Sequence, residues 1–145
     1  MSLSSILVPV SGTPTDKHLV ELACQLLHSS SSRLFILYIM EIKRSLPIDA
    51  ALPGDVIHGD NVLKSMEKIA DNFKHETKGE LLQARETGYA IVHEAAKKHV
   101  DGIVMSVPNT IKYGKFHLEK TVPYVLENAH CKVILWHAEK VKQHS

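Results

Sequence analysis

An apolar run, Ser5-Ile6-Leu7-Val8-Pro9-Val10, stands at the head of a pattern that recurs along the chain. Its length suits a β-strand, and its lack of polar and apolar alternation is typical of a strand buried on both faces of a parallel sheet. Four later runs of similar length are rich in aliphatic and β-branched residues, although the run at 81–85 is more polar. The strands predicted from these runs are residues 5–10, 33–39, 81–85, 102–106 and 132–137.

Segments with helical spacing of apolar residues separate the predicted strands. Apolar residues three or four positions apart follow Pro14, recur from Val62 to Phe73, return after Gly88 and recur again over 122–129. This spacing forms one face of a helix, so four helices are expected to alternate with the five strands. Residues 40–60 contain two prolines and two glycines, and we expect them to form a long connection, either a flap or a variable surface loop.

Strands and helices that alternate in this way predict an α/β fold. The expected architecture is an open, doubly wound sheet of five parallel strands flanked by four helices, in a single domain over residues 1–145. Ligands of such sheets bind beyond the carboxyl ends of the strands, where the strand order reverses. The functional site is therefore expected at those ends.

Composition and charge exclude several classes of protein. The chain has 145 residues, of which 44% are apolar, enough for one globular domain with a sizeable core. It carries 17 Lys and Arg against 16 Asp and Glu, so it has no excess positive field for nucleic acid. The apolar runs are too short to cross a membrane, and no secretory signal is recognisable. We therefore expect no nucleic-acid binding, no membrane insertion and a cytoplasmic location.

Catalytic and metal-binding patterns do not emerge from the sequence. The ten histidines include His93, which is followed by Glu94, but the position at which a second zinc-binding histidine would stand is Lys97. No G-x-S-x-G nucleophile motif occurs. The two cysteines, Cys24 and Cys131, lack the spacing of zinc ligands and are expected to be buried free thiols. We therefore expect no enzyme activity, no catalytic residues and no metal site.

Two strand ends are expected to form a ligand crevice. Ser11-Gly12-Thr13 follows the first strand, and Ser106 and Asn109 stand at and after the end of the fourth. The two ends should be neighbours if these strands flank the point at which the strand order reverses. The seven glycines form neither of the usual phosphate-binding motifs, G-x-G-x-x-G and G-x-x-x-x-G-K-[ST]. A generic phosphate-binding loop is therefore not predicted.

Three segments resemble the hallmarks of the universal stress protein family, in the same order and at the usual spacing. They are Ile6-Leu7-Val8-Pro9-Val10-Ser11-Gly12-Thr13, Asp101-Gly102-Ile103-Val104-Met105 and Tyr124-Val125-Leu126-Glu127-Asn128-Ala129-His130-Cys131-Lys132-Val133. The resemblance covers essentially the whole chain and implies the nucleotide-binding, α-hydrolase-like sheet of that family. It places a vestigial nucleotide crevice at Pro9, Val10, Ser11, Ile39, Met105, Ser106, Asn109, Glu119, Lys120 and Thr121.

The ATP-binding motif of that family is altered in this chain. Members that bind ATP carry G-x-x-G-x9-G-[ST] after the fourth strand, and the matching positions here are Ser106, Asn109, Glu119 and Lys120. The ligand aspartate of the family falls at Ser11. A carboxylate about 4 Å from a phosphate would cost roughly 4 kcal/mol at an effective dielectric of 20. We expect weak or absent ATP binding and no cofactor, although nearby lysines could offset part of this cost or bind another anion.

The last strand is expected at an edge of the sheet, as the resemblance implies. Its apolar residues Val133, Ile134, Leu135 and Trp136 would promote aggregation if left bare. Pairing with the same strand of a second copy would cover them, so we expect a homodimer through this strand. In the alternative, Trp136 packs on the core of its own chain.

Three functions remain open at the level of the sequence. The first is a non-enzymatic stress-response module that acts by dimerisation and by binding a protein partner. The second is the cytosolic regulatory domain of an amino-acid permease or cation antiporter, because residues 118–136 also resemble the stress-protein domains fused to such transporters. The third, which the altered motif disfavours, is an ATP-binding or other nucleotide-binding sensor.

Overall fold

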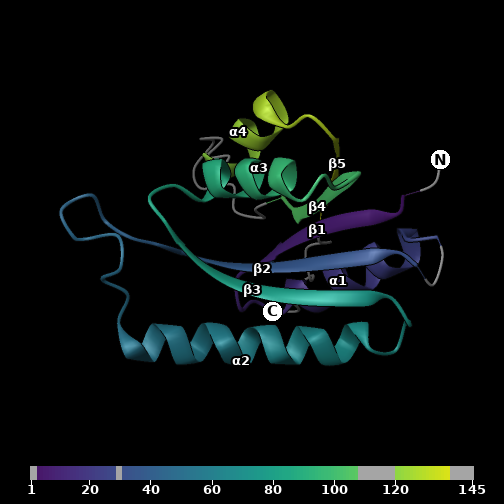
Figure 1. The fold of residues 1–145 in the computed structure, drawn as a ribbon, viewed down its shortest axis with the longest axis horizontal. Coiled ribbons are helices and arrows are strands. Elements are labelled where there is room, and N and C mark those ends of the chain that lie inside the picture. Colours follow the sequence, from purple (N-terminus) through teal and green to yellow (C-terminus); the bar gives the residue numbers. More distant parts are fainter. Residues whose placement is uncertain (1–2, 29–30, 108–119, 138–145) are drawn as a thin grey trace, which may run out of the picture.

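The computed structural model describes residues 3–28, 31–107 and 120–137, and strands and helices alternate along the chain (Figure 1). In chain order the elements are β1 (Ser5–Val10), α1 (Thr15–Leu26), β2 (Arg33–Glu41), α2 (Pro53–Ala70), β3 (Glu76–Ala84), α3 (Thr87–Lys97), β4 (Gly102–Ser106), α4 (Thr121–Asn128) and β5 (Lys132–Trp136). The five strands form one parallel sheet in the order β3-β2-β1-β4-β5. The predicted α/β class and the doubly wound sheet are confirmed.

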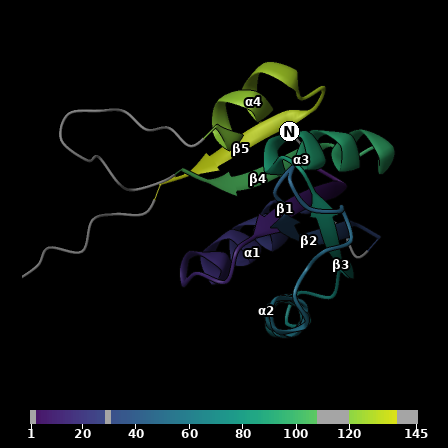
Figure 2. The same cartoon turned by 90° about the vertical axis from the view of Figure 1, so that its left-hand side faces the viewer.

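The sheet lies between two layers of helices. Figure 2 shows α1 and α2 on one face and α3 and α4 on the other. Ile6 and Val8 of β1 pack in the core under α1 and α2, while Leu7 packs in the core under α3 and α4. All three side chains have no exposed surface, which explains why this strand is apolar along its length.

The connection expected at residues 40–60 is shorter than predicted, because α2 begins at Pro53. Leu52 is extended and Pro53 occupies the first turn of the helix, a position at which its missing N–H costs little. Gly59 lies inside α2, where a Cβ atom would come within 2.5 Å of Leu81 and 2.8 Å of Tyr38. Gly59, one of the two glycines that indicated a loop, therefore allows a helix to pack closely on the sheet.

The third strand was predicted too short. β3 begins at Glu76, five residues before the predicted start at Leu81, and pairs with β2 along its whole length. Its first half is polar because β3 is an edge strand whose faces are only partly covered. Three smaller differences concern boundaries: β2 extends to Glu41, β5 ends at Trp136, and α2 ends at Ala70, before Phe73.

The strand order reverses between β1 and β4, as expected for the site. β1 pairs with β4 at Ile6 and Leu7, whereas its pairing with β2 continues to Val10. Pro9, which has no N–H for a ladder hydrogen bond, lies just beyond the point at which pairing with β4 ends. The two strands thus open apart toward their carboxyl ends.

The two cysteines are free and differ in exposure. Cys24 is buried in the core of α1, and burial followed by the charge of Glu21 raises its pKa to about 11. Cys131 is half-buried, contrary to the expectation of full burial, because it follows α4 at the rim of the α3 and α4 core. Burial also raises its pKa, so both thiols remain protonated at neutral pH.

Candidate functional site

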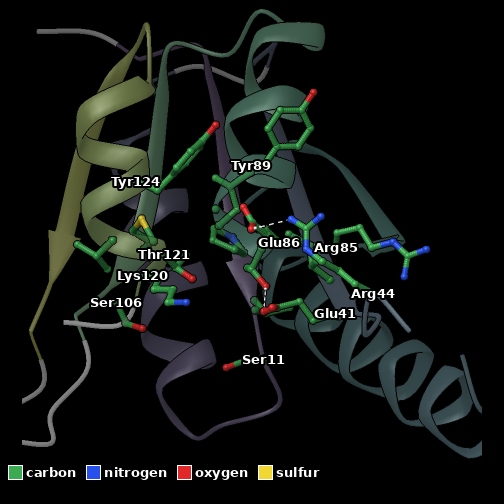
Figure 3. Close-up of a pocket in the computed structure, with 18 residues that line it drawn as sticks. Ser11, Glu41, Arg44, Arg85, Glu86, Tyr89, Ser106, Lys120, Thr121 and Tyr124 are labelled. Carbon is green, nitrogen blue, oxygen red and sulfur yellow. Dashed lines mark hydrogen bonds and ion pairs between the residues drawn. The ribbon is translucent and has the colours of Figure 1, made fainter. Parts of the chain in front are cut away.

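A cavity with a volume of about 790 Å³ opens at the carboxyl ends of the strands. Its walls come from the ends of β1, β2 and β4 and from the amino ends of α3 and α4 (Figure 3). We call this cavity the crevice. It lies where β1 and β4 separate, which is the position at which open α/β sheets bind ligands.

The structure brings together all the predicted site residues that fall within its described residues. Pro9, Val10 and Ser11 form the wall at the end of β1, and Ile39 lies beside them on β2. Met105 and Ser106 come from β4, and Lys120 and Thr121 from the start of α4. Two predicted residues, Asn109 and Glu119, lie outside the described residues.

The β2 and β3 side of the crevice was missed by the sequence analysis. Glu41, Arg44, Glu86, Thr87 and Tyr89 line this side. The signal was available in part, because Arg85-Glu86-Thr87 directly follows β3 and the carboxyl ends of parallel strands meet at one edge. These residues form no recognised ligand-binding motif, so the sequence does not single them out.

Two exposed contacts join polar side chains on this wall. The Arg44 guanidinium lies 3.2 Å from a carboxylate oxygen of Glu86, so these two charges offset one another. The Thr87 hydroxyl donates a hydrogen bond of 2.7 Å to Glu41 (Figure 3), which leaves the negative charge of Glu41 in place. Both contacts are exposed, so each contributes little to stability.

Arg85 binds the segment that connects β2 to α2, residues 42–52, at the side of the crevice. Its guanidinium donates to the backbone carbonyls of Lys43 and Leu46, at 2.5 Å and 2.7 Å. Ile42 N–H also donates to the carbonyl of Ala84, which continues the contact between the two chain segments. The connection is therefore fixed to the end of β3 through backbone atoms, which the sequence does not reveal.

The end of β1 contains a buried carboxylate. Asp16, in the first turn of α1, is only 2% exposed and accepts hydrogen bonds from the backbone N–H groups of Ser11 and Gly12. Burial raises the pKa of Asp16, and these backbone hydrogen bonds, together with that from Thr13, oppose the rise. The sequence did not single out Asp16, because its carboxylate binds backbone N–H groups of the preceding loop and such contacts produce no recognisable motif.

The amino end of α4 supplies a cation to the crevice. Lys120 directly precedes the helix, and its ammonium group has no ion pair with any residue that the structure describes. Thr121 is the first helical residue, and no side-chain hydrogen bond caps the helix. Pro123 stands in the first turn, where the missing N–H of a proline costs little.

The helices α3 and α4 meet closely above the crevice. A Cβ atom on Gly88 would lie 3.1 Å from the Cβ of Tyr124, so only glycine fits here without displacement. Tyr89 and Tyr124 stand on these two helices along the upper part of the crevice (Figure 3). Their phenol rings add planar apolar surface to a wall that is otherwise polar.

β5 forms the edge of the sheet beside β4, as expected. Leu135 is 39% exposed, whereas Ile134 and Trp136 pack partly buried against the core of α1. The Trp136 ring stacks on His18 of α1, with ring centres 5.3 Å apart. The alternative of a tryptophan packed on its own chain is thus observed, and the residue that remains most available at this edge is Leu135.

Neither a metal-binding cluster nor a helix that could span a membrane occurs in residues 3–28, 31–107 and 120–137. No three His, Cys, Asp or Glu side chains in these ranges are placed to hold a metal ion. No helix in these ranges is both long and apolar enough to span a membrane.

The fold is shared with proteins of known structure. Two structures of a universal stress protein from Archaeoglobus fulgidus superpose with TM-scores of 0.74 and 0.69, and the second is a complex with dAMP. Their sequence identities are 16% and 15%, over 90% and 93% of this chain and 96% and 98% of theirs. A universal stress protein in complex with cAMP gives a TM-score of 0.70 at 15% identity, over 96% of this chain and 100% of that one. Identities this low support similarity of fold alone.

The sequence itself provides the assignment to a family. No curated protein matches the chain. Residues 3–137 match the model of the universal stress protein family, which covers nearly every element described above. This chain therefore belongs to the universal stress protein family.

Proposed function

We propose that this chain is a non-enzymatic regulatory or protein-interaction module of the stress response, with weak or absent ATP binding. Membership of the universal stress protein family supports a role in stress. The supporting observation within the structure is the state of the charged groups around the crevice. The backbone N–H groups at the end of β1 are occupied by Asp16, and Arg44 is paired with Glu86.

These contacts leave few groups for a triphosphate. Each phosphate group needs several N–H donors or cations close by. Among the described residues of the crevice, Lys120 is a cation without an ion pair, while Glu41 and Glu86 place carboxylates in the opposite wall. Ser106, which matches a glycine of the family's ATP motif, adds a side chain at the end of β4. These features support weak binding of a polyanion.

The same arrangement supports a non-enzymatic role. Among the residues that the structure describes, Glu41 and Glu86 are the carboxylates that line the crevice, and each contacts another wall residue. A general acid or base must lie within hydrogen-bond distance of the substrate proton that it transfers, and its pKa must suit proton transfer. Through their contacts with Thr87 and Arg44, Glu41 and Glu86 instead connect the start of α3 to the end of β2 and to the residues that follow it. We therefore assign them a structural role.

A nucleotide sensor is the second candidate. The related structures include complexes with cAMP and dAMP. The crevice, with about 790 Å³, falls within the range of about 300–1,000 Å³ typical of small-molecule pockets. A nucleoside or monophosphate would meet fewer carboxylates than ATP and is the class that this candidate favours.

The proposed partners are a second copy of this chain and another protein, in the cytoplasm. The edge position of β5 supports the homodimer. The partner protein could be a permease or antiporter, fused to this domain or bound by it. A membrane-spanning segment encoded in the same reading frame would select the fused arrangement.

One experiment separates the module from the sensor. Protein purified without added nucleotide is denatured, and the released nucleotides are measured by mass spectrometry. The proposal predicts less than about one adenine nucleotide per ten protomers, because weak ligands are lost on purification. Incubation with Mg-ATP should release phosphate no faster than buffer does. Equimolar bound nucleotide, or saturable phosphate release, would contradict the proposal.

A further inference from the structure

The outer edge of β3 is open for backbone hydrogen bonds. β3 forms the edge of the sheet opposite to β5 (Figure 2), and in the part of the chain that the structure describes no strand pairs with its outer side. Glu76 N–H donates to the carbonyl of Ser32, and the carbonyl of Ala84 accepts from Ile42 N–H, so the even-numbered residues of β3 bond toward β2. Backbone groups alternate in direction along a strand, so the N–H and C=O groups of the odd-numbered residues within 77–83 point outward.

The two halves of this edge differ in charge. The amino half carries Glu76, Lys78 and Glu80, and charged side chains normally keep an open edge from pairing with another chain. The carboxyl half, residues 81–84, carries no charge. Its two leucines pack partly buried against the two cores of the protein, which fixes this half in position. The edge is therefore protected by charge at one end only.

A groove adjoins the uncharged half of the edge. Its volume is about 450 Å³; residues 82–86 form one wall, and α3 forms the other. Tyr89 and His93, one turn apart on α3, line this second wall, and both are exposed. Their rings stack with centres 5.8 Å apart. We call this cavity the edge groove, and its stacked rings provide a planar surface for a large apolar side chain.

We infer that the carboxyl half of β3 and the edge groove together bind an extended segment of a partner protein. The segment adds a sixth strand to the sheet, and its backbone bonds to the outward N–H and C=O groups of Leu81 and Gln83. Every second side chain of an added strand points to the face on which Leu82 packs, which is the face that α3 covers. One large apolar or aromatic side chain of the segment therefore enters the edge groove and provides specificity, while the backbone bonds provide affinity.

Two features favour a partner segment over other occupants. A row of N–H and C=O groups along a strand edge is matched by extended backbone, which neither a helix nor a small molecule supplies. A second copy of this chain is less suitable, because pairing through β3 in addition to the proposed pairing through β5 would extend the assembly without limit. The inference rests on the proposed role as a protein-interaction module and names the surface that serves it.

The test selects binders from a phage library of random twelve-residue peptides on the natural protein. The enriched peptides should share a large apolar or aromatic residue at one position. They should bind Gln83→Pro at least about tenfold more weakly, because proline removes an N–H on the open edge and leaves the ladder with β2 complete. Gln83→Thr keeps this N–H and is the matched control, which should bind the peptides as the natural protein does.

Two further measurements locate the peptide on the natural protein. In nuclear magnetic resonance of 15N-labelled protein, the Leu81 and Gln83 N–H signals should shift saturably with peptide. Methylation of the peptide nitrogens at alternate residues should abolish binding in one of the two registers only, since one set of N–H groups faces β3. If Gln83→Pro does not fold, the methylated peptides decide by the same criterion.

A second variant tests the edge groove separately. His93→Ser removes one of the two stacked rings and should weaken the enriched peptides by about tenfold. The same peptides with alanine at the shared position should bind the natural protein and His93→Ser equally.

Three results would overturn the inference: no enriched peptide, peptides that bind folded Gln83→Pro or both methylated registers as tightly as before, and an oligomer of the natural protein that Gln83→Pro dissociates. The last would assign the edge to a second copy of the chain. None of these results affects the nucleotide measurement that tests the proposed function. Equimolar bound nucleotide, in turn, would contradict the proposed function and leave peptide binding at β3 in place.

Discussion

At the scale of single residues, a buried ion cluster stabilises one end of α3. The Lys98 ammonium lies 2.9 Å from Glu94 and 3.2 Å from Glu80, and the side chains of Lys98 and Glu94 are 11% and 10% exposed. Burial alone would lower the pKa of Lys98, but the hydrogen bonds and charges of the two glutamates outweigh it and raise the pKa. The cluster depends on its central cation.

Replacing that cation should destabilise the protein. Lys98→Met leaves the buried Glu94 without its cation and leaves Glu80 with the exposed Lys78, 3.5 Å away, and we expect a loss of about 3 kcal/mol in the free energy of unfolding at pH 7. The pKa of Glu80 is lowered despite burial, because Lys98 pairs with it, so this contribution is present above the ordinary value of 4.5 and is lost as the pH falls.

Denaturant unfolding at pH 7 and pH 3 measures both effects. The exposed Lys97→Met on the same helix is the control and should change stability by less than about 0.5 kcal/mol. Equal losses for the two variants would show that the cluster contributes nothing.

A second carboxylate joins the start of β1 to the turn before β4. Asp101 accepts hydrogen bonds from the Ser4 hydroxyl at 2.6 Å, from Ser4 N–H at 2.8 Å and from Ser5 N–H at 3.1 Å. The Ser4 hydroxyl is the main cause of its lowered pKa, which lies below the ordinary 3.8. A lowered carboxyl pKa stabilises the fold above 3.8 and ceases to do so as the pH falls through the folded value.

Asp101→Asn should therefore cost about 1–2 kcal/mol at pH 7 and nothing at a pH below the folded pKa. The measurement is the free energy of unfolding as a function of pH, with Asp60→Asn on the exposed side of α2 as the control. A deficit that persists unchanged in acid would show that packing, not charge, makes Asp101 important.

At the scale of elements, the two glycines of α2 differ in how closely they are packed, so they are expected to tolerate a side chain differently. A Cβ on Gly59 would come within 2.5 Å of Leu81, while a Cβ on Gly54 in the same helix meets nothing within 4 Å. Alanine favours a helix over glycine by up to about 1 kcal/mol, so the two positions separate helix propensity from packing.

The two substitutions should have opposite effects on stability. Gly54→Ala should raise the free energy of unfolding by about 0.5 kcal/mol, since it changes propensity alone. Gly59→Ala should lower it by about 1–3 kcal/mol because α2 must move away from β2 and β3. Thermal unfolding of both variants checks this, and a stabilised Gly59→Ala would mean that α2 is not seated as described.

The elements also show what a sequence reveals. β1 and β4 were predicted at their observed bounds because burial on both faces makes most of their residues apolar. The first half of β3 and the start of α2 were missed because partly exposed segments carry no such pattern. In the crevice, the ends of β1 and β4 were predicted from the strand pattern, and Lys120 and Thr121 of α4 from the family resemblance. Arg85 and Asp16 were missed because they act on backbone atoms of other segments. Contacts between a side chain and backbone atoms produce no recognisable spacing of residue types in the sequence.

At the scale of the whole molecule, the open edge at β5 predicts a homodimer. Leu135 is 39% exposed there, whereas its neighbours Ile134 and Trp136 are partly buried against the core. Leu135→Lys should therefore weaken the dimer without unfolding the protomer, because an edge lysine disfavours strand pairing. Light scattering should give twice the 16.2 kDa chain mass for the natural protein and the single mass for the variant.

Ile57→Lys is the matched control, since Ile57 is 61% exposed on α2, which packs on β2 and β3 at the opposite edge of the sheet. It should leave the dimer intact. A natural protein that remains monomeric at high concentration would refute the dimer.

For the molecule as a whole, the central proposal is that the crevice has weak or no affinity for polyphosphate. Calorimetric titration of the purified protein with Mg-ATP tests this most directly. We predict a dissociation constant above about 100 µM, or no measurable heat of binding. Saturable one-to-one binding in the low micromolar range would contradict the account.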